Sequence, residues 1–270
     1  MSGELLRRTL VTNRWRVAIV GAGLALWGFL LPVIYATFGA DFRRLVDSGL
    51  FAQAFEAFSA FTGGSIFTLN GSVALGFIHP IAIALVAALA IGYPVAAIAG
   101  ERQRGTLEVL LARPISRRDM YRTALGSTVL FVALALAANL AGVVAGAALF
   151  GVGDELDHGR LLLAWANAVL LFAALGSIAL AASASFDRLL PALGAVIGFA
   201  IVSYAVEFLG ALWPDIAWLR PWSVFHYFQP AEILGGDAAT GDLAVLAVVV
   251  AASATYGLWI FPRRDIAAPS

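Results

Sequence analysis

The sequence contains no cysteine and no lysine, and both absences restrict what the chain can do. Without cysteine it forms neither a disulfide bond nor a thiolate metal site. All 17 basic residues are arginine, so the lysine with which a P-loop reaches the nucleotide phosphates is missing. If the chain takes part in ATP-driven work, we expect another chain to hydrolyse the ATP.

Charge is also scarce. Only 13% of the 270 residues are charged, where about a quarter is usual for a soluble domain, and 61% are hydrophobic. The apolar residues form blocks of roughly 20, the length of a helix that crosses a bilayer. We therefore predict an all-α polytopic membrane protein with one domain, residues 1–270, since no internal repeat or linker divides it. The six predicted spans are Val17–Phe38, Gly76–Ala99, Tyr121–Phe150, Leu161–Ser185, Pro191–Trp213 and Leu243–Phe261.

Histidine is too sparse for a metalloenzyme. The three histidines, His79, His158 and His226, are far apart, and none belongs to an H-E-x-x-H pattern. No serine nucleophile with a base is recognisable. A membrane enzyme is therefore disfavoured, and we expect no catalytic residue, no metal site and no nucleic-acid partner.

The segment "MSGELLRRTLVTNRWR" is too long and too charged for the start of a cleaved signal, and no A-x-A-like site follows, so we expect the first span to be retained. Leu6, Leu10 and Val11 can share one helical face, with arginines on the others. This pattern predicts that residues 1–16 form an amphipathic helix on the cytoplasmic membrane surface.

The arginines also predict the orientation. With the N-terminus inside, thirteen arginines face the cytoplasm and four face outward, a clear positive-inside bias. The inner ones are Arg7, Arg8, Arg14, Arg16, Arg102, Arg104, Arg113, Arg117, Arg118, Arg122, Arg188, Arg263 and Arg264; the outer ones are Arg43, Arg44, Arg160 and Arg220. Both termini are predicted to be cytoplasmic, in a multi-pass protein of the cell (plasma) membrane.

Two outer segments are rich in aromatic residues. Phe51, Phe55 and Phe58 recur at helical spacing and predict an interfacial helix. The segment 213–242, which begins "WPDIAWLRPWSVFHYFQPAEILGG", is too broken by proline to cross the membrane. We predict short aromatic helices that dip into the outer interface there, with an ordinary aromatic belt as the alternative for any single ring.

Several single features leave alternatives open. Glu207 is the only acid placed within a span, which makes it a candidate for substrate binding or gating, although it lies near enough to the outer interface to be hydrated. Tyr93-Pro94 predicts a kink in span two, which is a hinge or merely structural. Gly142–Gly146 and Gly194–Gly198 are small-xxx-small patterns that suit helix contacts. His79 is expected to be an interfacial hydrogen-bonding residue, and the acidic segment 154–158 a solvated turn.

The densest arginine cluster lies in "GERQRGTLEVLLARPISRRD", residues 100–119. Leu107, Leu110 and Leu111 predict a short helix with an apolar stripe, on which the charged residues point elsewhere. Pro114 ends it, and Ser116 with Asp119 predicts a capping box that opens span three. A loop that only fixes topology does not need its own helix and acidic residues, so we predict a folded cytoplasmic docking element.

This segment resembles the one that follows span two in ABC-2 type export permeases, where E-x-x-x-G-T-L-E-x-L-L-x-x-P-x-S-R recurs. The matching residues are Glu101, Gly105, Thr106, Leu107, Glu108, Leu110, Leu111, Pro114, Ser116 and Arg117. "SVFHYFQPAEIL" resembles a second segment of these families, with Val224 where proline is frequent. The resemblance implies the ABC-2 (type V exporter-like) fold, with a coupling helix between spans two and three and outer re-entrant helices between spans five and six.

The resemblance also implies a function: a permease subunit that pairs with a second copy, identical or paralogous, and docks ABC ATPase subunits. The chain itself then binds no cofactor, and ATP and magnesium belong to the ATPase. The implied ATPase-coupling residues are Glu101, Arg104, Gly105, Thr106, Leu107, Glu108, Leu110 and Leu111. Candidates for the substrate path or gate are Tyr93, Phe199, Tyr204, Glu207, Phe225, Tyr227 and Phe228.

The apolar spans suggest a hydrophobic or amphiphilic cargo such as a drug, an antibiotic or a lipid, in contact with membrane lipid. The alternative is an ion-coupled secondary transporter or channel. Such proteins rely on buried charges, for which Glu207 alone is thin support.

Overall fold

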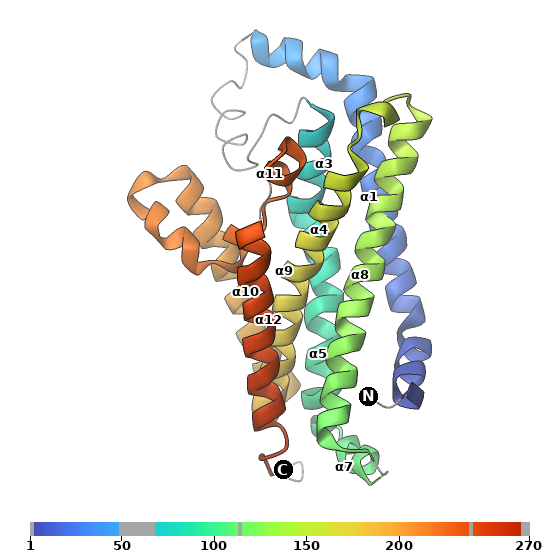
Figure 1. The fold of residues 1–270 in the computed structure, drawn as a ribbon. Coiled ribbons are helices and arrows are strands. Elements are labelled where there is room, and N and C mark those ends of the chain that lie inside the picture. The colour runs from blue at the N-terminus through green and yellow to red at the C-terminus, as the bar shows by residue number, and fades with distance from the viewer. Residues whose placement is uncertain (1–2, 49–67, 113–114, 238–239, 266–270) are drawn as a thin grey trace.

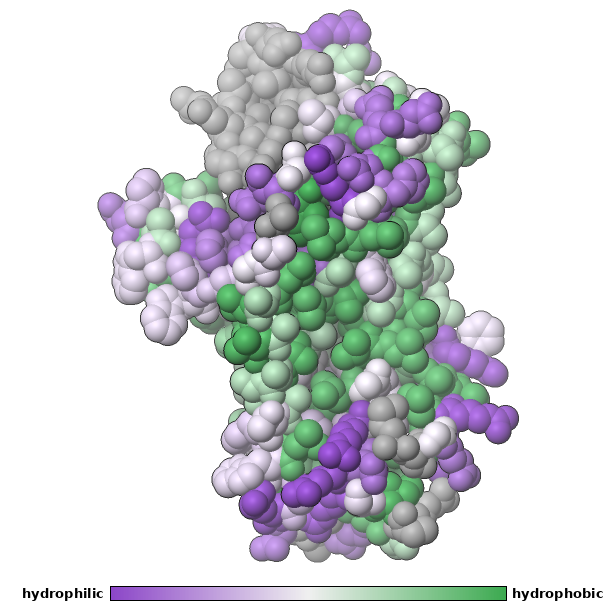
Figure 2. Space-filling view, in the orientation of Figure 1, coloured by the Kyte–Doolittle hydropathy of each residue, from purple (hydrophilic) through white to green (hydrophobic). Residues whose placement is uncertain are grey.

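The computed structural model describes residues 3–48, 68–112, 115–237 and 240–265. All regular secondary structure in these ranges is helical, and six of the helices are long and apolar enough to cross a membrane. Figure 1 shows them side by side in one bundle, and Figure 2 shows apolar side chains across its middle with polar ones gathered at both ends. The chain is a multi-pass helical membrane protein. The predicted helix at Phe51, Phe55 and Phe58 lies outside the described residues.

The first helix is longer than the sequence pattern suggested. Helix α1 runs without interruption from Gly3 to Asp47, so the described part of the predicted N-terminal helix, residues 3–16, is not separate from span one. No proline and no glycine lies between Glu4 and Val20 to break the helix, and Pro32 is accommodated within it. The charged N-terminal turns therefore continue the axis of the first span.

The region predicted as span two contains the spanning helix and the end of a separate short helix before it. A short apolar helix, α3 (Leu69–Ile78), ends at His79, and the spanning helix begins at Pro80 rather than at the predicted Gly76. The cause is local: a residue before proline is driven towards extended backbone, and His79 has φ −64° and ψ 136°. Its Nδ1 accepts a hydrogen bond from the Ile81 amide at 3.3 Å, which caps the new helix. His79 is thus a hydrogen-bonding residue, as expected.

Below His79 the helix continues to Gln103 through alternating α and π turns. The order is α4 (Pro80–Ala87), the π turn η1 (Ala88–Gly92), α5 (Tyr93–Val95), the π turn η2 (Ala96–Gly100) and α6 (Glu101–Gln103). Pro94 has no N–H to give to the preceding turn, yet the helix continues past it, with one π turn before the Tyr93-Pro94 pair and one after it. The sequence predicted a kink at this pair, and the structure has a helix with these two wider turns.

The remaining spans lie within a few residues of their predicted positions: α8 (Arg117–Leu149), α9 (His158–Ser185), α10 (Leu189–Leu212) and α12 (Thr240–Ile260). The short elements between them are α7 (Thr106–Leu111), η3 (Gly153–Glu155), η4 (Pro214–Trp222), η5 (Val224–Tyr227) and α11 (Pro230–Gly235). The last three make up the helical part of the aromatic segment 213–242. Asp157 caps α9, with its carboxylate accepting from the amides of Gly159 and Arg160, so the acidic turn has a structural role.

Close helix contact explains one of the two small-residue patterns. A Cβ on Gly142 would overlap the carbonyl oxygen of Ala25, and one on Gly146 would overlap that of Phe29, so α8 packs backbone to backbone on α1. By contrast, no atom of the described chain lies within 4 Å of a Cβ built on Gly194 or Gly198. Helix α9 is the most buried span, whereas α10 and α12 lie at the edge.

The two ends of the bundle differ. The N-terminus, the C-terminus and α7 lie at one end, and α3, α11 and the turn before α9 lie at the other (Figure 1). The short helices of residues 100–119 are therefore on the same side as both termini, as the sequence predicted.

Candidate functional site: the coupling segment and the apolar groove

The coupling segment, residues 101–112, is a locked turn between α6 and α7. Gly105 joins the two helices with φ 70°, a conformation that glycine adopts without the strain that a Cβ would bring. The Glu101 carboxylate closes the turn by accepting from the Arg104 guanidinium and the Thr106 hydroxyl. Residues 101–106, with the pattern E-x-x-R-G-T, thus form one rigid corner between the two helices.

The leucine stripe of α7 faces the bundle. Leu107 is fully buried, and Leu110 and Leu111 are half-buried against a cluster that includes Tyr121 and Phe261. The leucines therefore anchor the segment. What remains exposed is a mainly polar face with two apolar residues, the small Ala112 and Val109, which is 69% exposed. The exposed residues are Gln103, Arg104, Thr106, Glu108, Val109 and Ala112.

Arg102 corrects the expectation that all charged residues of this segment point away from the bundle. Its side chain is only 3% exposed, and Nη1 donates to the Phe186 carbonyl at 2.9 Å and to Asp187 Oδ1 at 3.1 Å. Beside it, the Gln103 side-chain oxygen accepts from the Leu189 amide at 2.9 Å. The segment is thereby fastened to the corner between α9 and α10, because one guanidinium can serve a carbonyl and a carboxylate together.

The end of the last span joins the same corner. Arg264 Nη2 donates to Asp187 Oδ1 at 2.9 Å, and Arg117 Nη1 donates to the Arg264 carbonyl at 2.7 Å. Arg117 therefore connects α8 to the segment that follows α12, in addition to being one of the arginines that predict the orientation. The Ser116 hydroxyl accepts from the Asp119 amide at 3.0 Å and donates to Asp119 Oδ2 at 2.7 Å, so Ser116 caps α8 as predicted. Pro114 lies outside the described residues.

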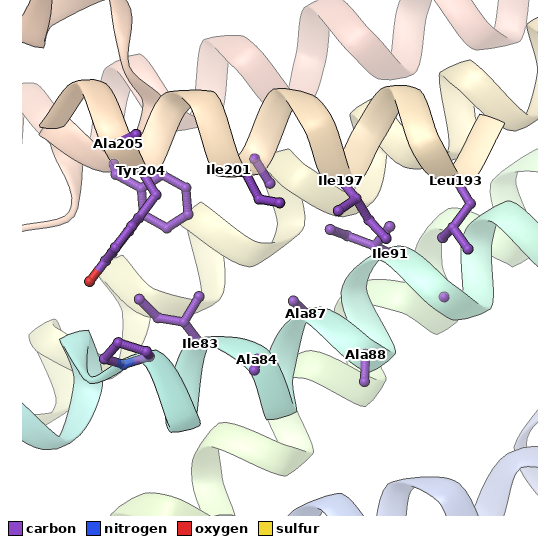
Figure 3. Close-up of a pocket in the computed structure, with 14 residues that line it drawn as sticks. Ile83, Ala84, Ala87, Ala88, Ile91, Leu193, Ile197, Ile201, Tyr204 and Ala205 are labelled. Carbon is purple, nitrogen blue, oxygen red and sulfur yellow. The ribbon is translucent and has the colours of Figure 1, made fainter. Parts of the chain in front are cut away.

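A separate groove of about 540 Å³ lies between spans two and five. Ile83, Ala87 and Ile91 form one wall, and Leu193 and Ile197 belong to the facing wall on α10 (Figure 3). The lining is apolar apart from the hydroxyl of Tyr204 near one end. Its volume is in the range of sites for drug-sized molecules, and its chemistry suits a hydrophobic one.

The sequence matches the family described as ABC-2 family transporter protein over residues 9–266. The chain belongs to the ABC-2 family of transporter proteins. It is therefore an ABC transporter permease, the transmembrane component of such a transporter, and its family implies partnership with ABC ATPase subunits. A search of curated proteins found no match for this permease.

In the permease, the residues predicted for the path do not form one cluster. Tyr204 and Phe225 line the groove. Phe199 faces a second pocket of about 340 Å³ on another side of α10. Tyr93 packs on Phe131 with ring centroids 5.0 Å apart, and it lines a polar pocket of about 260 Å³ beside the N-terminal turns of α1.

The last two aromatic residues have structural contacts outside the groove lining. Tyr227 donates its hydroxyl to the Pro221 carbonyl at 2.8 Å, and Phe228 is buried against Phe172. The aliphatic residues that line most of the groove were not identified from sequence, because alanine and isoleucine occur throughout the spans.

Glu207 of the permease is buried rather than hydrated. It is 8% exposed, and its Oε1 accepts from Arg220 at 3.0 Å (Nε) and 2.6 Å (Nη2). Its Oε2 lies 3.3 Å from Nδ1 of His226. The arginine that completes the pair comes from η4, thirteen residues further along the chain. No group of three or more histidine, aspartate or glutamate side chains in the described ranges could hold a metal ion.

Proposed function

We propose that this permease is the transmembrane subunit of an ATP-driven exporter in the plasma membrane, with both termini in the cytoplasm. It would move a hydrophobic or amphiphilic compound out of the cytoplasm or the inner leaflet. The observation that carries the proposal is the coupling segment, a rigid corner with an exposed face at the end of the bundle where both termini lie. Family membership supports it.

The exposed face of the coupling segment is the proposed ATPase site. Glu108 and Arg104 offer both charge signs, and Val109 supplies an apolar contact at the centre of the face. ATP and magnesium would be bound by the partner, since this chain has no lysine for a P-loop.

The tethers behind that face give a route for force. When the ATPase moves the coupling segment, Arg102 and Gln103 would carry the α9–α10 corner with it, through Phe186, Asp187 and Leu189. Span two would move as well, because α6 is its last turn. The two walls of the apolar groove would thus move, with the displacement starting at their cytoplasmic ends.

The second permease copy is proposed to pack on α10. Only 17% of the residues in the apolar stretch of that helix are buried within the chain. In the described part of the molecule, Gly194 and Gly198 of the helix have open space around them. Two copies meeting there would bring two apolar grooves together, in contact with each other and with membrane lipid. This geometry is the same for identical and for paralogous copies.

The test is reconstitution of the permease with an ABC ATPase in proteoliposomes, followed by ATP-dependent movement of a fluorescent amphiphile. Glu108→Arg, which reverses one charge on the exposed face, should separate ATP hydrolysis from transport. The matched control is Glu232→Arg, on α11 at the opposite end. Transport that does not depend on ATP and follows a proton gradient would instead support a secondary transporter. ATP hydrolysis by the permease alone would contradict the proposal.

A further inference from the structure

One end of the apolar groove is lined by two aromatic rings from different elements. Tyr204 lies on α10 and Phe225 on η5, and their rings meet edge to face with centroids 5.4 Å apart. Both residues line the groove, and Leu193 lies at its other end (Figure 3). Since Leu193 is near the end of α10 that adjoins the coupling segment, the Tyr204–Phe225 contact lies at the outer end of the groove.

Phe225 belongs to a lid, residues Pro214–Tyr227, made of η4 and η5. In Figure 1 the orange part of the chain that includes η4 projects from the bundle beside the upper end of α10. Its far end is fixed to α9: the buried Asn167 donates to the Tyr227 carbonyl at 2.9 Å and accepts from the Gln229 amide at 3.1 Å. The lid is thus anchored on the C-terminal side of Phe225. A second set of contacts, described next as the front contacts, holds the lid against α10.

The front contacts follow one face of α10. Ser223 donates its hydroxyl to the Ser203 carbonyl at 2.7 Å, and both serines are buried. One turn further out, Glu207 accepts two hydrogen bonds from Arg220 and faces His226. These contacts set the position of Phe225, which lies between the residues that make them.

Helix α10 leaves space for the arginine of the Glu207–Arg220 pair. Gly210, one turn beyond Glu207 on α10, leaves the space that the Arg220 side chain occupies, since a Cβ there would lie 2.5 Å from Arg220 Cγ. Glu207 is also the acid that sequence reasoning placed inside a span, where an ionisable group is costly unless it is paired. A purely structural contact at this place could have been apolar, like the lining of the groove beside it.

We propose that Glu207 is a positioning residue that latches the lid over the outer end of the groove, and that substrate release requires the Glu207–Arg220 pair to separate. This inference rests on the proposed export function for its biological meaning. The latch itself is a property of the lid and can be measured without transport.

The first experiment uses accessibility. The chain has no cysteine, so Ala200→Cys, one turn inward of Tyr204 on the groove wall, introduces the only thiol. In purified permease in liposomes, a membrane-impermeant maleimide added outside should label this thiol slowly. Adding Glu207→Gln should raise the labelling rate roughly fivefold or more, because the lid opens more often. The matched control Asp215→Asn changes an exposed acid on the same lid and should leave the rate unchanged.

Equal labelling rates for Glu207→Gln and Asp215→Asn, in protein that elutes as folded, would overturn the latch. If Glu207→Gln does not fold, Arg220→Gln opens the same pair from the lid side and is expected to give the same increase. Labelling that does not change in Arg220→Gln would contradict the inference equally.

The second experiment locks the lid. The Ser223 hydroxyl bonds to the Ser203 carbonyl, and the Ser203 hydroxyl accepts from the Val224 amide at 3.4 Å, so both side chains lie at this contact. Ser203→Cys with Ser223→Cys places two thiols there, and oxidation is expected to join them. In the complex with its ATPase, oxidation should lower transport by roughly tenfold or more, and a reductant should restore it, since an opening step would be blocked. Full transport by the cross-linked protein would overturn the inference. Absence of ATP-dependent transport in the unmodified permease would count against the export function alone, because the labelling result stands without it.

Discussion

The hydroxyl of Ser183 in α9 stands between the Ala99 amide and the Val95 carbonyl of span two. It accepts from the amide at 2.8 Å and donates to the carbonyl at 2.8 Å. In a regular α-helix these two backbone groups, four residues apart, would bond to each other. A side chain of another span therefore replaces one rung of the ladder, and this insertion accounts for the π turn η2 directly before the coupling segment.

Ser183→Ala should destabilise the permease by about 1–2 kcal/mol, because the amide and the carbonyl lose their partner in a buried place. Ser177→Ala is the control, since the Ser177 hydroxyl is equally buried and donates to the Ala174 carbonyl on its own helix. Thermal unfolding in detergent measures both. Equal stability of the two variants would mean that span two closes the ladder itself once the hydroxyl is gone.

Arg102→Ala should cost about 2–3 kcal/mol in the free energy of unfolding, through lost charged hydrogen bonds and lost packing of the stem. The partner Asp187 is more than half exposed, so its ion pair contributes little to this figure. Arg104→Ala removes the same charge from an exposed pair and should cost less than about 1 kcal/mol.

The same Arg102 variant should lower transport for each ATP hydrolysed if the corner carries force. Parallel measurement of hydrolysis and transport in proteoliposomes gives that ratio. A ratio equal to that of the unmodified permease would show that Arg102 is needed for folding only.

These two arginines also show where sequence reasoning stops. Arg102 and Arg104 are two residues apart in one charged segment, yet the first is buried and the second exposed. What separates them is the position of Asp187, which lies 85 residues further on and meets Arg102 only after the bundle has formed. The spans, in contrast, were predictable because each depends on its own apolar length.

The composition of the candidate path was predictable only in part. Phe199 and Tyr204 were placed together as aromatic residues of span five, but five residues correspond to about 140° around a helix, so they face different sides. A helical projection would have separated them. It would not have shown which side faces the groove, because that depends on how α4 and α10 pack, and the apolar residues of both helices look alike in sequence.

His79 predicts a pH dependence. Burial lowers the pKa of His79 from its ordinary value of 6.5, and its Nδ1 must stay unprotonated to accept from the Ile81 amide. A lowered pKa in the folded state adds stability that is fully present above pH 6.5 and is lost as the pH falls through the folded pKa. The melting temperature should therefore fall between pH 7.5 and about pH 5.5.

His79→Asn keeps a side chain that caps helices and does not titrate, so this variant should lose less of its melting temperature over the same range. His158→Asn, which removes an exposed histidine at the start of α9, is the control and should follow the unmodified protein. If His79→Asn follows it too, the pH dependence comes from another group.

The two glycine patterns give opposite expectations for the stability of the monomer when a larger side chain replaces glycine. Gly142→Ala should destabilise the folded chain by about 1–3 kcal/mol, since its Cβ meets the rigid backbone of α1. Gly194→Leu meets open space within the chain, so the monomer should remain folded, while a second copy packed on α10 would be pushed away. Unfolding curves and light scattering of the purified protein separate the two effects. A dimer that survives Gly194→Leu at the same protein concentration would place the seam on another helix, because a leucine cannot be accommodated where two helices approach through glycine.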